Sequence, residues 1–390
     1  LIRDYSEKLE NDKTYCFWSK ESDNITKDFA PLASHSWSKI RIDNLDAQQI
    51  GDLKYYHIKS IDLYRSAKKI LLDYDAEVKK ERVEEITSGI KTTVISSKGD
   101  YRGERIFDSR PPMIHKKLSK DQNILQSFVG YKIKLKNKAF NPEVCTLMDF
   151  NVQQQGHTQF FYVLPFSDST ALVELTRFGT EPISKSESKA IIDDYICEKF
   201  GPYDLVEIEL GVVPMYMDLS PPKLIEGVTN IGTRANKVKP STGYAFKNMY
   251  THAEAIVNKT EVRKTAARFR FYDRLLILIL ALWPKRGKPI FQQLFRARDT
   301  AFVLKFLDEK TSVLDDAKMF YKLPIGIFLR SCLVLFIRKF GSILLLFAPI
   351  LLYFILEAVF ASATEAIMYS VLVIGLFVVG IPHGAMDHTT

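Results

Sequence analysis

A single carboxylate inside an apolar run has the clearest chemical potential in this sequence. Glu174 stands between Ala-Leu-Val and Leu175, in a segment typical of a strand. A carboxyl group withdrawn from water has a raised pKa and stays protonated, so it can serve as a general acid. The alternative is an ordinary Glu on the solvent face of a strand, which is the commoner position. A proton donor in an apolar cleft is the functional interpretation, since such acids mark functional sites, and both interpretations stay open at this point.

Asp149 lies 25 positions before Glu174 and is the second carboxylate of interest. Its segment could form a strand beside that of Glu174, and paired carboxylates can divide the acid and base roles of one reaction. An Asp that caps a turn or supports the fold is an equal alternative. Both interpretations stay open at this point.

Two segments rich in small residues form a candidate cofactor loop. Asn-Ile-Gly-Thr at 230–233 and Lys-Pro-Ser-Thr-Gly-Tyr at 239–244 precede a segment with helical character. Small residues let the backbone approach a ligand, and free N–H groups at a helix start favour negative charge. An ordinary Gly–Pro loop is the alternative. The candidate ligands of a cofactor are Gly232, Thr233, Pro240, Thr242 and Gly243.

The cysteines do not predict a metal site. The four are far apart, without CxxC or zinc spacing, and read as free thiols in a reducing compartment. They are Cys16, Cys145, Cys197 and Cys332.

Several predicted elements would position these residues. Alternating and apolar patterns predict strands at 36–42, 55–61, 128–135, 146–152, 160–164 and 171–176. Helical spacing predicts helices at 61–74, 185–200 and 245–257, with Ser184 and Glu187 as a capping box. This mixture predicts an α/β fold with an inserted, mostly antiparallel sheet.

Charge and hydropathy favour a membrane over nucleic acid as partner. The net charge is +8, but the basic residues are interleaved with acidic ones and cluster beside apolar runs, which suits anionic lipids. The nine apolar residues at 275–283 are either a core helix or a dip into one leaflet. The uncharged runs 341–356 and 366–382 predict a transmembrane hairpin. Arg338 and Lys339 place its start, and hence the preceding domain, on the cytoplasmic side of the membrane.

Six motifs in order resemble the lycopene cyclase family of bacterial carotenoid synthesis. The central one runs from Leu-Met-Asp at 147–149 through Leu-Pro-Phe-Ser at 164–167 to Leu-Val-Glu-Leu-Thr at 172–176. The others lie at 11–18, 108–111, 126–131, 211–215 and 239–244, so the resemblance covers residues 1 to about 325.

This resemblance implies a reaction and a cofactor. It assigns Glu174 as the acid/base group of lycopene cyclisation and reduced FAD as a cofactor whose negative charge stabilises a carbocation, with NAD(P)H as reductant. It places the flavin pyrophosphate and ring at 230–244, although Arg234-Ala235-Asn236-Lys237 depart from the family pattern. No GxGxxG turn is present. We expect that turn upstream of Leu1, with Asp4 as the ribose ligand.

The last residues resemble a second family. Pro-His-Gly-Ala-Met-Asp-His at 382–388 is similar to the opening motif of the membrane β-carotene 15,15′-dioxygenases related to bacterioopsin-linked proteins. The resemblance implies that His383 binds iron, with Asp387 and His388 supporting it. A metal site needs more ligands than this segment holds. Because the chain also starts at Leu1 without Met, we expect both of its ends to be cut.

Together these observations predict two domains. Residues 1–325 are expected to form a Rossmann-like flavoprotein domain with an inserted antiparallel sheet, and 326–390 the transmembrane start of a dioxygenase. The predicted function is lycopene β-cyclase, acting on lycopene and other carotenoids in a lipid bilayer. A flavin oxidoreductase acting on an isoprenoid lipid, and a carotenoid-binding scaffold, are the alternatives.

Overall fold

The computed structural model describes residues 2–3, 10–88, 91–111, 123–217, 225–261 and 264–340, together with 370 and 373. The chain divides into two compact units, Leu1–Ile325 and Gly326–Thr390. The first unit holds all the sheets and is the one described below.

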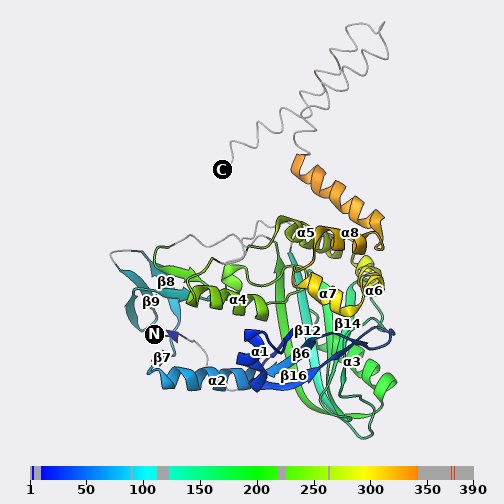
Figure 1. The fold of residues 1–390 in the computed structure, drawn as a ribbon, viewed down its shortest axis with the longest axis horizontal. Coiled ribbons are helices and arrows are strands. Elements are labelled where there is room, and N and C mark those ends of the chain that lie inside the picture. Colours follow the sequence, from blue (N-terminus) through cyan, green and yellow to red (C-terminus); the bar gives the residue numbers. More distant parts are fainter. Residues whose placement is uncertain are drawn as a thin grey trace. The chain divides into compact units, whose positions relative to one another are not determined.

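A seven-stranded sheet forms the centre of this unit (Figure 1). All neighbouring strands are antiparallel except β13 and β4. In spatial order the strands are β16 (Tyr203–Tyr216), β12 (Asn123–Leu135), β15 (Thr170–Gly179), β14 (Thr158–Pro165), β13 (Val144–Asp149), β4 (Lys39–Ile42) and β5 (Gln48–Gln49). The predicted antiparallel sheet is thus confirmed.

A second sheet packs against one face of the first. It has the order β2-β6-β3 and is antiparallel. Its strands are β2 (Thr14–Lys20), β6 (Leu53–Lys59) and β3 (Ala33–Trp37). The single strand predicted at 36–42 is therefore wrong, because the chain breaks at Ser38 and passes from this sheet into the larger one. Trp37 is fully buried at this crossing and donates to Pro165 O at 3.1 Å.

Parallel pairing in the described residues is limited. Besides β13–β4, it comprises β1 (Ile2–Arg3) with β7 (Val78–Lys79), and β11 (Ile106–Asp108) with β17 (Val228–Asn230). A separate antiparallel sheet contains β8 (Val83–Thr87), β9 (Thr92–Ser96) and β10 (Gly99–Gly103). The predicted parallel part of the fold is represented only by these short pairs.

The opposite face of the large sheet is covered by α3 (Lys185–Phe200), whose bounds match the predicted helix. Alternate strand residues such as Val129, Phe161 and Leu175 pack with Ile192 and Ile196 of this helix into one hydrophobic core. Ser184 caps the helix by accepting from Glu187 N at 3.2 Å. The other half of the predicted capping box is replaced, because the Glu187 carboxylate pairs with Arg177 at 2.7 Å.

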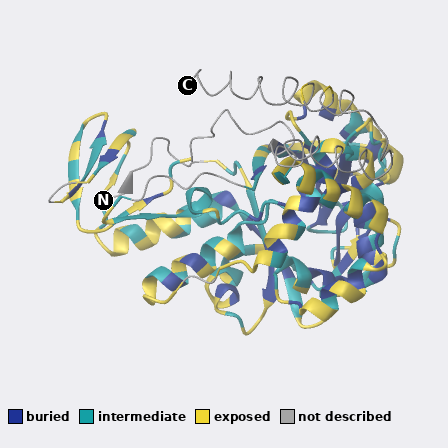
Figure 2. Cartoon of the chain, turned by 90° about the horizontal axis from the view of Figure 1, so that it is seen from above, coloured by how far each residue is buried: buried dark blue, intermediate teal, exposed yellow. Residues whose placement is uncertain are grey.

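The remaining helices frame the sheets, and buried positions concentrate where they meet (Figure 2). They are α1 (Asn24–Phe29), α2 (Ser60–Asp73), α4 (Phe246–Val257), α5 (Ala267–Leu282), α6 (Gly287–Ala297), α7 (Thr300–Leu307) and α8 (Val313–Phe320), with the 3₁₀ helices η1 (Ala30–Leu32), η3 (Gly232–Ala235) and η4 (Pro284–Arg286). The α2 and α4 helices match their predictions to within one residue.

The apolar run at 275–283 is a core helix. It forms the second half of α5, whose residues 277–280 are each no more than 2% exposed and which contacts β12 and β15. The interpretation as a membrane dip is therefore wrong. Its basic flanks are explained instead by neighbours such as Asp316, which accepts from Arg268 at 3.0 Å.

Among the described residues, no single helix has the length and hydropathy to cross a bilayer. Only the successive helices Val313–Phe320 and Ile325–Phe340, taken together across the break between them, pass that test. The transmembrane hairpin predicted at 341–382 lies outside the described residues.

Candidate active site

Glu174 lies in β15 and points toward the smaller sheet. In register it stands opposite Gly130 of β12 on one side and Tyr162 of β14 on the other. Its carboxylate accepts from Thr176 Oγ1 at 3.1 Å, and the residue as a whole is half-buried. The predicted location of this residue inside a strand is confirmed.

A second carboxylate meets Glu174 from the edge strand β16. Glu209 is 6% exposed and stands opposite Gly130 in register, so the glycine lies between the two acids. Thr14 Oγ1 donates to Glu209 Oε2 at 2.7 Å. Glu209 is not among the residues predicted from the sequence, although it stands between Ile208 and Leu210 in another strand-like run.

Both carboxyl groups have raised pKa values. Burial is the largest cause for Glu174, followed by the negative charge of Glu209 and a hydrogen bond between the two carboxyl groups. Burial also raises the pKa of Glu209, but the hydrogen bonds from Thr14 and with Glu174 oppose it. The stronger causes act on Glu174, so a raised pKa makes this residue the candidate for a general acid.

Tyr162 and Cys16 interact electrostatically with Glu174, and Tyr55 and Tyr244 are neighbours of these two residues. Tyr162 and Tyr55 are buried, and burial raises their pKa values well above the usual range, so both remain neutral. Tyr244 hydrogen-bonds Tyr162, and burial raises its pKa to about 12. Cys16 is half-buried, and desolvation raises the pKa of its thiol too. Electron-rich aromatic faces attract cations, so these surroundings suit a transient carbocation.

An apolar cavity opens beside Tyr162. It encloses about 360 Å³ of space, including the solvent at its open mouth. Most of its wall is hydrocarbon and comes from the large sheet and from α6, whereas the candidate cofactor loop contributes the polar part. It is lined by Gln126, Met148, Phe160, Tyr162, Phe178, Ser241, Thr242, Tyr244, Phe291, Leu294, Phe295 and Leu307.

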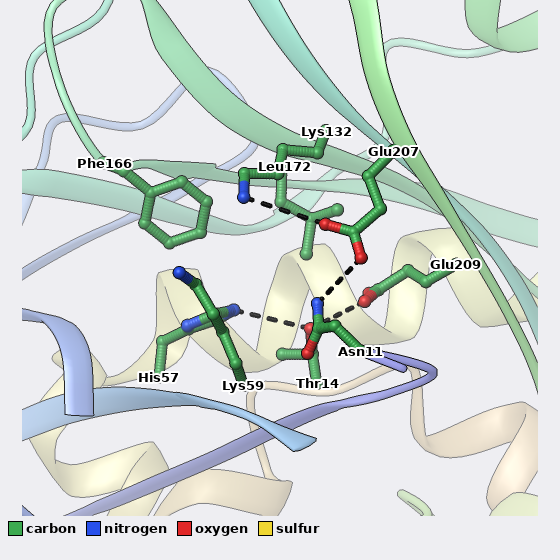
Figure 3. A pocket seen from close by; sticks show the side chains of 9 residues that line it. All are labelled: Asn11, Thr14, His57, Lys59, Lys132, Phe166, Leu172, Glu207 and Glu209. Carbon is green, nitrogen blue, oxygen red and sulfur yellow. Dashed lines mark hydrogen bonds and ion pairs between the residues drawn. The ribbon is translucent and has the colours of Figure 1, made fainter. Parts of the chain in front are cut away.

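A polar pocket opens beside Glu209 (Figure 3). Thr14, Asn11 and Glu209 point into it together with His57, whose Nε2 is 3.4 Å from Thr14 Oγ1. Burial lowers the pKa of His57 to about 3, so the ring is neutral. The remaining lining residues are Lys59, Lys132, Phe166, Leu172 and Glu207. This pocket therefore gives Glu209 polar surroundings.

The candidate cofactor loop forms a compact turn before α4. Gly243 N donates to Lys239 O at 2.9 Å, and Lys239 N donates to Tyr244 O at 2.8 Å. Gly243 has φ +72°, and a Cβ there would lie 2.4 Å from Gln126 Oε1, so a side chain is excluded. Pro240 and Thr242 lie in the same turn. The helix that follows has no side-chain cap, which leaves its first N–H groups for a ligand.

Gly232 and Thr233 belong to the preceding segment, η3, where Gly232 has φ +62°. Arg234, at which the sequence departs from the family pattern, binds Asp108 Oδ2 at 2.8 Å and Asn230 Oδ1 at 2.9 Å. The guanidinium thereby ties this segment to β11 and supplies an anchor in place of small residues.

A buried ion pair connects the loop to α5. Lys239 Nζ lies 3.1 Å from Asp273 Oδ1 and 2.8 Å from Glu309 Oε1, and Ser241 Oγ donates to Asp273 at 2.5 Å. Burial raises the pKa of Asp273. Lys239 and Asp273 are both buried, with exposed fractions of 7% and 5%. Their ion pair therefore holds the turn against the core helix α5.

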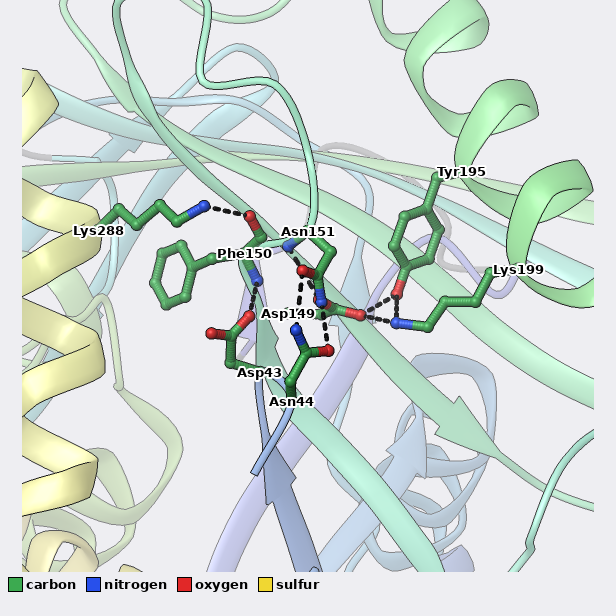
Figure 4. Close-up of polar contacts among 8 residues, drawn as sticks. All are labelled: Asp43, Asn44, Asp149, Phe150, Asn151, Tyr195, Lys199 and Lys288. Carbon is green, nitrogen blue, oxygen red and sulfur yellow. Dashed lines mark hydrogen bonds and ion pairs between the residues drawn. The ribbon is translucent and has the colours of Figure 1, made fainter. Parts of the chain in front are cut away.

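Asp149 does not share a site with Glu174. It pairs in register with Phe161, whose ring stacks on Tyr195 of α3, so it faces the opposite side of the sheet. Its carboxylate accepts from Tyr195 Oη at 2.6 Å, from Asn151 N at 2.9 Å and from Lys199 Nζ (Figure 4). Although burial opposes it, these bonds lower the pKa of Asp149, which is ionised. The geometry fits the structural alternative and not the acid–base one.

We expect Asp149→Asn to reduce stability without removing chemistry. Loss of the charged acceptor should lower the free energy of unfolding at neutral pH by about 1.5–3 kcal/mol. Because folding depresses the pKa of Asp149, its contribution is present above the usual Asp pKa and disappears as the pH falls through the folded value. Urea unfolding at neutral and acidic pH checks this. A large loss of activity at unchanged stability would contradict it.

Two predicted ligands cannot be placed. Asp4 and His383 lie outside the described residues. In the part of the chain that is described, no group of three or more His, Cys, Asp or Glu side chains could hold a metal ion.

Comparison with known proteins identifies the family. A family model described as lycopene cyclase protein matches residues 2–332. The chain is 25% identical over 286 residues to the lycopene beta-cyclase of Pseudescherichia vulneris, an alignment that covers 67% of this chain and 72% of that protein.

Similar solved structures include a geranylgeranyl bacteriochlorophyll reductase-like protein from Thermoplasma acidophilum and a flavoprotein/dehydrogenase from Cytophaga hutchinsonii. The first is 11% identical with a TM-score of 0.49, covering 87% of this chain and 92% of that chain. The second is 11% identical with a TM-score of 0.47, covering 70% and 76%. The lycopene cyclase family model spans most of the chain, and the sequence motifs that resemble this family include Glu174 and the loop before α4. This chain belongs to the lycopene cyclase family.

Proposed function

We propose that this protein is a lycopene β-cyclase in which Glu174 is the acid. The observation that carries the proposal is a carboxyl group kept protonated by burial and by a neighbouring carboxylate, among neutral tyrosines. The family membership and the lycopene beta-cyclase of Pseudescherichia vulneris support the same substrate class.

The reaction is an isomerisation and needs no net oxidant or proton. Glu174 donates its proton to the terminal double bond of an acyclic end group, which leaves a tertiary cation. A second double bond attacks this cation, a ring C–C bond forms, and loss of a ring proton to a carboxylate yields the β ring. The aromatic side chains beside Glu174 stabilise the cation and exclude water that would trap it.

The loop before α4 fits a flavin. Gln126 Oε1 is a buried acceptor without a hydrogen-bond donor among the described residues, beside Gly243 and at the wall of the apolar cavity. A buried orphan acceptor suits a ligand N–H, and the uncapped start of α4 suits a phosphate. When bound, reduced FAD supplies negative charge that stabilises the cation electrostatically. Gly232, Thr233, Pro240, Thr242 and Gly243 are the residues that would hold it.

The decisive experiment measures product and reductant together. The full chain is incubated anaerobically with lycopene in liposomes, FAD and NADPH, and carotenoids are separated by chromatography. We expect cyclic ends to accumulate while NADPH consumption stays far below product formation. Stoichiometric NADPH oxidation would instead establish the oxidoreductase alternative, and lycopene binding without product would establish the scaffold alternative.

Membrane attachment and a second domain are separate proposals. Lycopene resides in bilayers, and Ile325, Leu329, Leu333 and Phe336 expose apolar side chains on the helix Ile325–Phe340. We expect the full chain to float with liposomes, and a soluble fraction after flotation would argue against attachment. The proposed dioxygenase start, with His383 as an iron ligand, predicts further His-bearing apolar spans in the coding sequence beyond residue 390.

A further inference from the structure

We propose that Glu174 and Glu209 share one proton across the gap left by Gly130, so that Glu209 is the positioning residue that keeps Glu174 in its acid form. The catalytic consequence rests on the proposed function, whereas the sharing of the proton does not.

Gly130 creates the space in which the two acids meet. It lies in the middle of a strand and stands opposite both Glu174 and Glu209. A Cβ at this position would lie 2.8 Å from Glu209 Cγ and 3.2 Å from Glu209 Oε1. Glycine weakens a strand interior and often marks a close approach. Here the group that approaches is a carboxyl side chain.

Glu209 has an unsatisfied oxygen at this gap. No donor of the described residues reaches its buried Oε1 atom. An ionised carboxylate can only accept hydrogen bonds, but a protonated carboxyl group can donate one. Glu174 is within hydrogen-bonding reach of Glu209. Glu209 Oε1 therefore gains a hydrogen-bond donor when Glu174 carries the proton. If both carboxyl groups were ionised, this oxygen would have no donor and the two negative charges would repel each other.

The surroundings make the pair asymmetric. Thr14 donates to Glu209 Oε2 at 2.7 Å and has no such contact with Glu174, so the negative charge is stabilised on Glu209. His57 beyond Thr14 is neutral. The other titratable groups facing the pair or lining its pocket are Cys16 on β2, Tyr55 and Lys59 on β6, Lys132 on β12, Tyr162 on β14, Glu207 on β16 and Tyr244 before α4.

The first test is the pH profile of cyclisation in Glu209→Gln. This variant keeps the size of the side chain and removes its charge, so the pKa of Glu174 should fall, although burial still raises it. We expect the alkaline limb of kcat to move to lower pH by about one unit, which lowers activity about tenfold on that limb. Activity on the acidic plateau and KM should be retained. Gly130→Ala, which pushes Glu209 away, should move the limb in the same direction.

The matched control is Asp204→Asn, which removes an exposed carboxylate from the same strand, β16, and should leave the profile unchanged. An equal loss of activity at every pH in Glu209→Gln, or an unmoved limb, would overturn the proposal, because a structural defect has no reason to depend on the protonation of Glu174.

The second test does not depend on activity. Infrared difference spectroscopy of the full chain follows the C=O band of protonated carboxyl groups during a pH titration. We expect one band that persists to neutral pH, is absent in Glu174→Gln and titrates at lower pH in Glu209→Gln. If this band behaves as expected but no rings form, the proton is shared and the proposed function fails. If rings form but the band is unaffected by Glu209→Gln, the shared proton is wrong.

Discussion

Replacing Glu174 with Gln is expected to abolish ring closure. The amide has nearly the same shape and can still accept from Thr176, but it has no proton acidic enough for an alkene. General acid catalysis contributes about 10²–10⁴-fold to rates, and we expect a loss near the upper end because water does not protonate a hydrocarbon at neutral pH. In lycopene-accumulating cells that express the full-length variant, the pigment should stay red, and chromatography should detect no cyclic ends.

The control for this variant is Glu143→Gln, which neutralises a carboxylate whose side chain is 73% exposed in an ion pair with Lys39. Its pigment should match that of the unmodified protein. An orange shift with Glu174→Gln would refute the assignment of the acid.

The same substitution should change how stability depends on pH. Folding raises the pKa of Glu174, so the folded state holds this proton more tightly than the unfolded state does. The stabilisation is complete below the usual Glu pKa of about 4.3 and is lost as the pH rises through the folded value. Thermal unfolding should therefore show Glu174→Gln gaining stability relative to the unmodified protein as the pH increases. Parallel curves for the two proteins would mean that Glu174 titrates normally.

The second large effect is expected from Asp273→Ala in α5. This change leaves the buried ammonium of Lys239 with Glu309 alone and removes the acceptor of Ser241. Breaking a buried ion pair by removing one partner costs about 3–5 kcal/mol, and the remaining contact with Glu309 suggests the lower end. Because Lys239 begins the turn that holds the proposed flavin, the affinity for FAD should fall as well. Urea unfolding and fluorescence titration with FAD measure the two effects.

Two further variants test whether the effect comes from the lost charge of Asp273 or from any substitution on a helix. Asp273→Asn keeps an acceptor for Ser241 and should lose less stability than Asp273→Ala. Glu198→Ala removes an exposed carboxylate from another helix, α3, and should change the free energy of unfolding by less than about 0.5 kcal/mol. If Asp273→Ala binds FAD as tightly as the unmodified protein, the ion pair does not support the cofactor loop.

Local sequence patterns determined the elements and the first acid. The periodicity of α3 and its Ser184 cap are local properties, and the predicted bounds match the structure. Alternation likewise placed Glu174 in a strand between apolar neighbours, since side-chain direction in a strand follows from position alone. The loop at 239–244 was also predicted from the sequence, because small residues directly before a helix form a local pattern.

Tertiary structure decided which acids meet. Asp149 and Glu174 lie near each other along the sequence, but strand register places them on opposite faces of one sheet, and no local pattern reveals register. Glu209 reaches Glu174 only because the edge strand β16 pairs with β12 and Gly130 has no side chain. The apolar run in α5 was ambiguous for the same reason: its composition suits lipid or a protein core, and its contacts with the sheet decide between them.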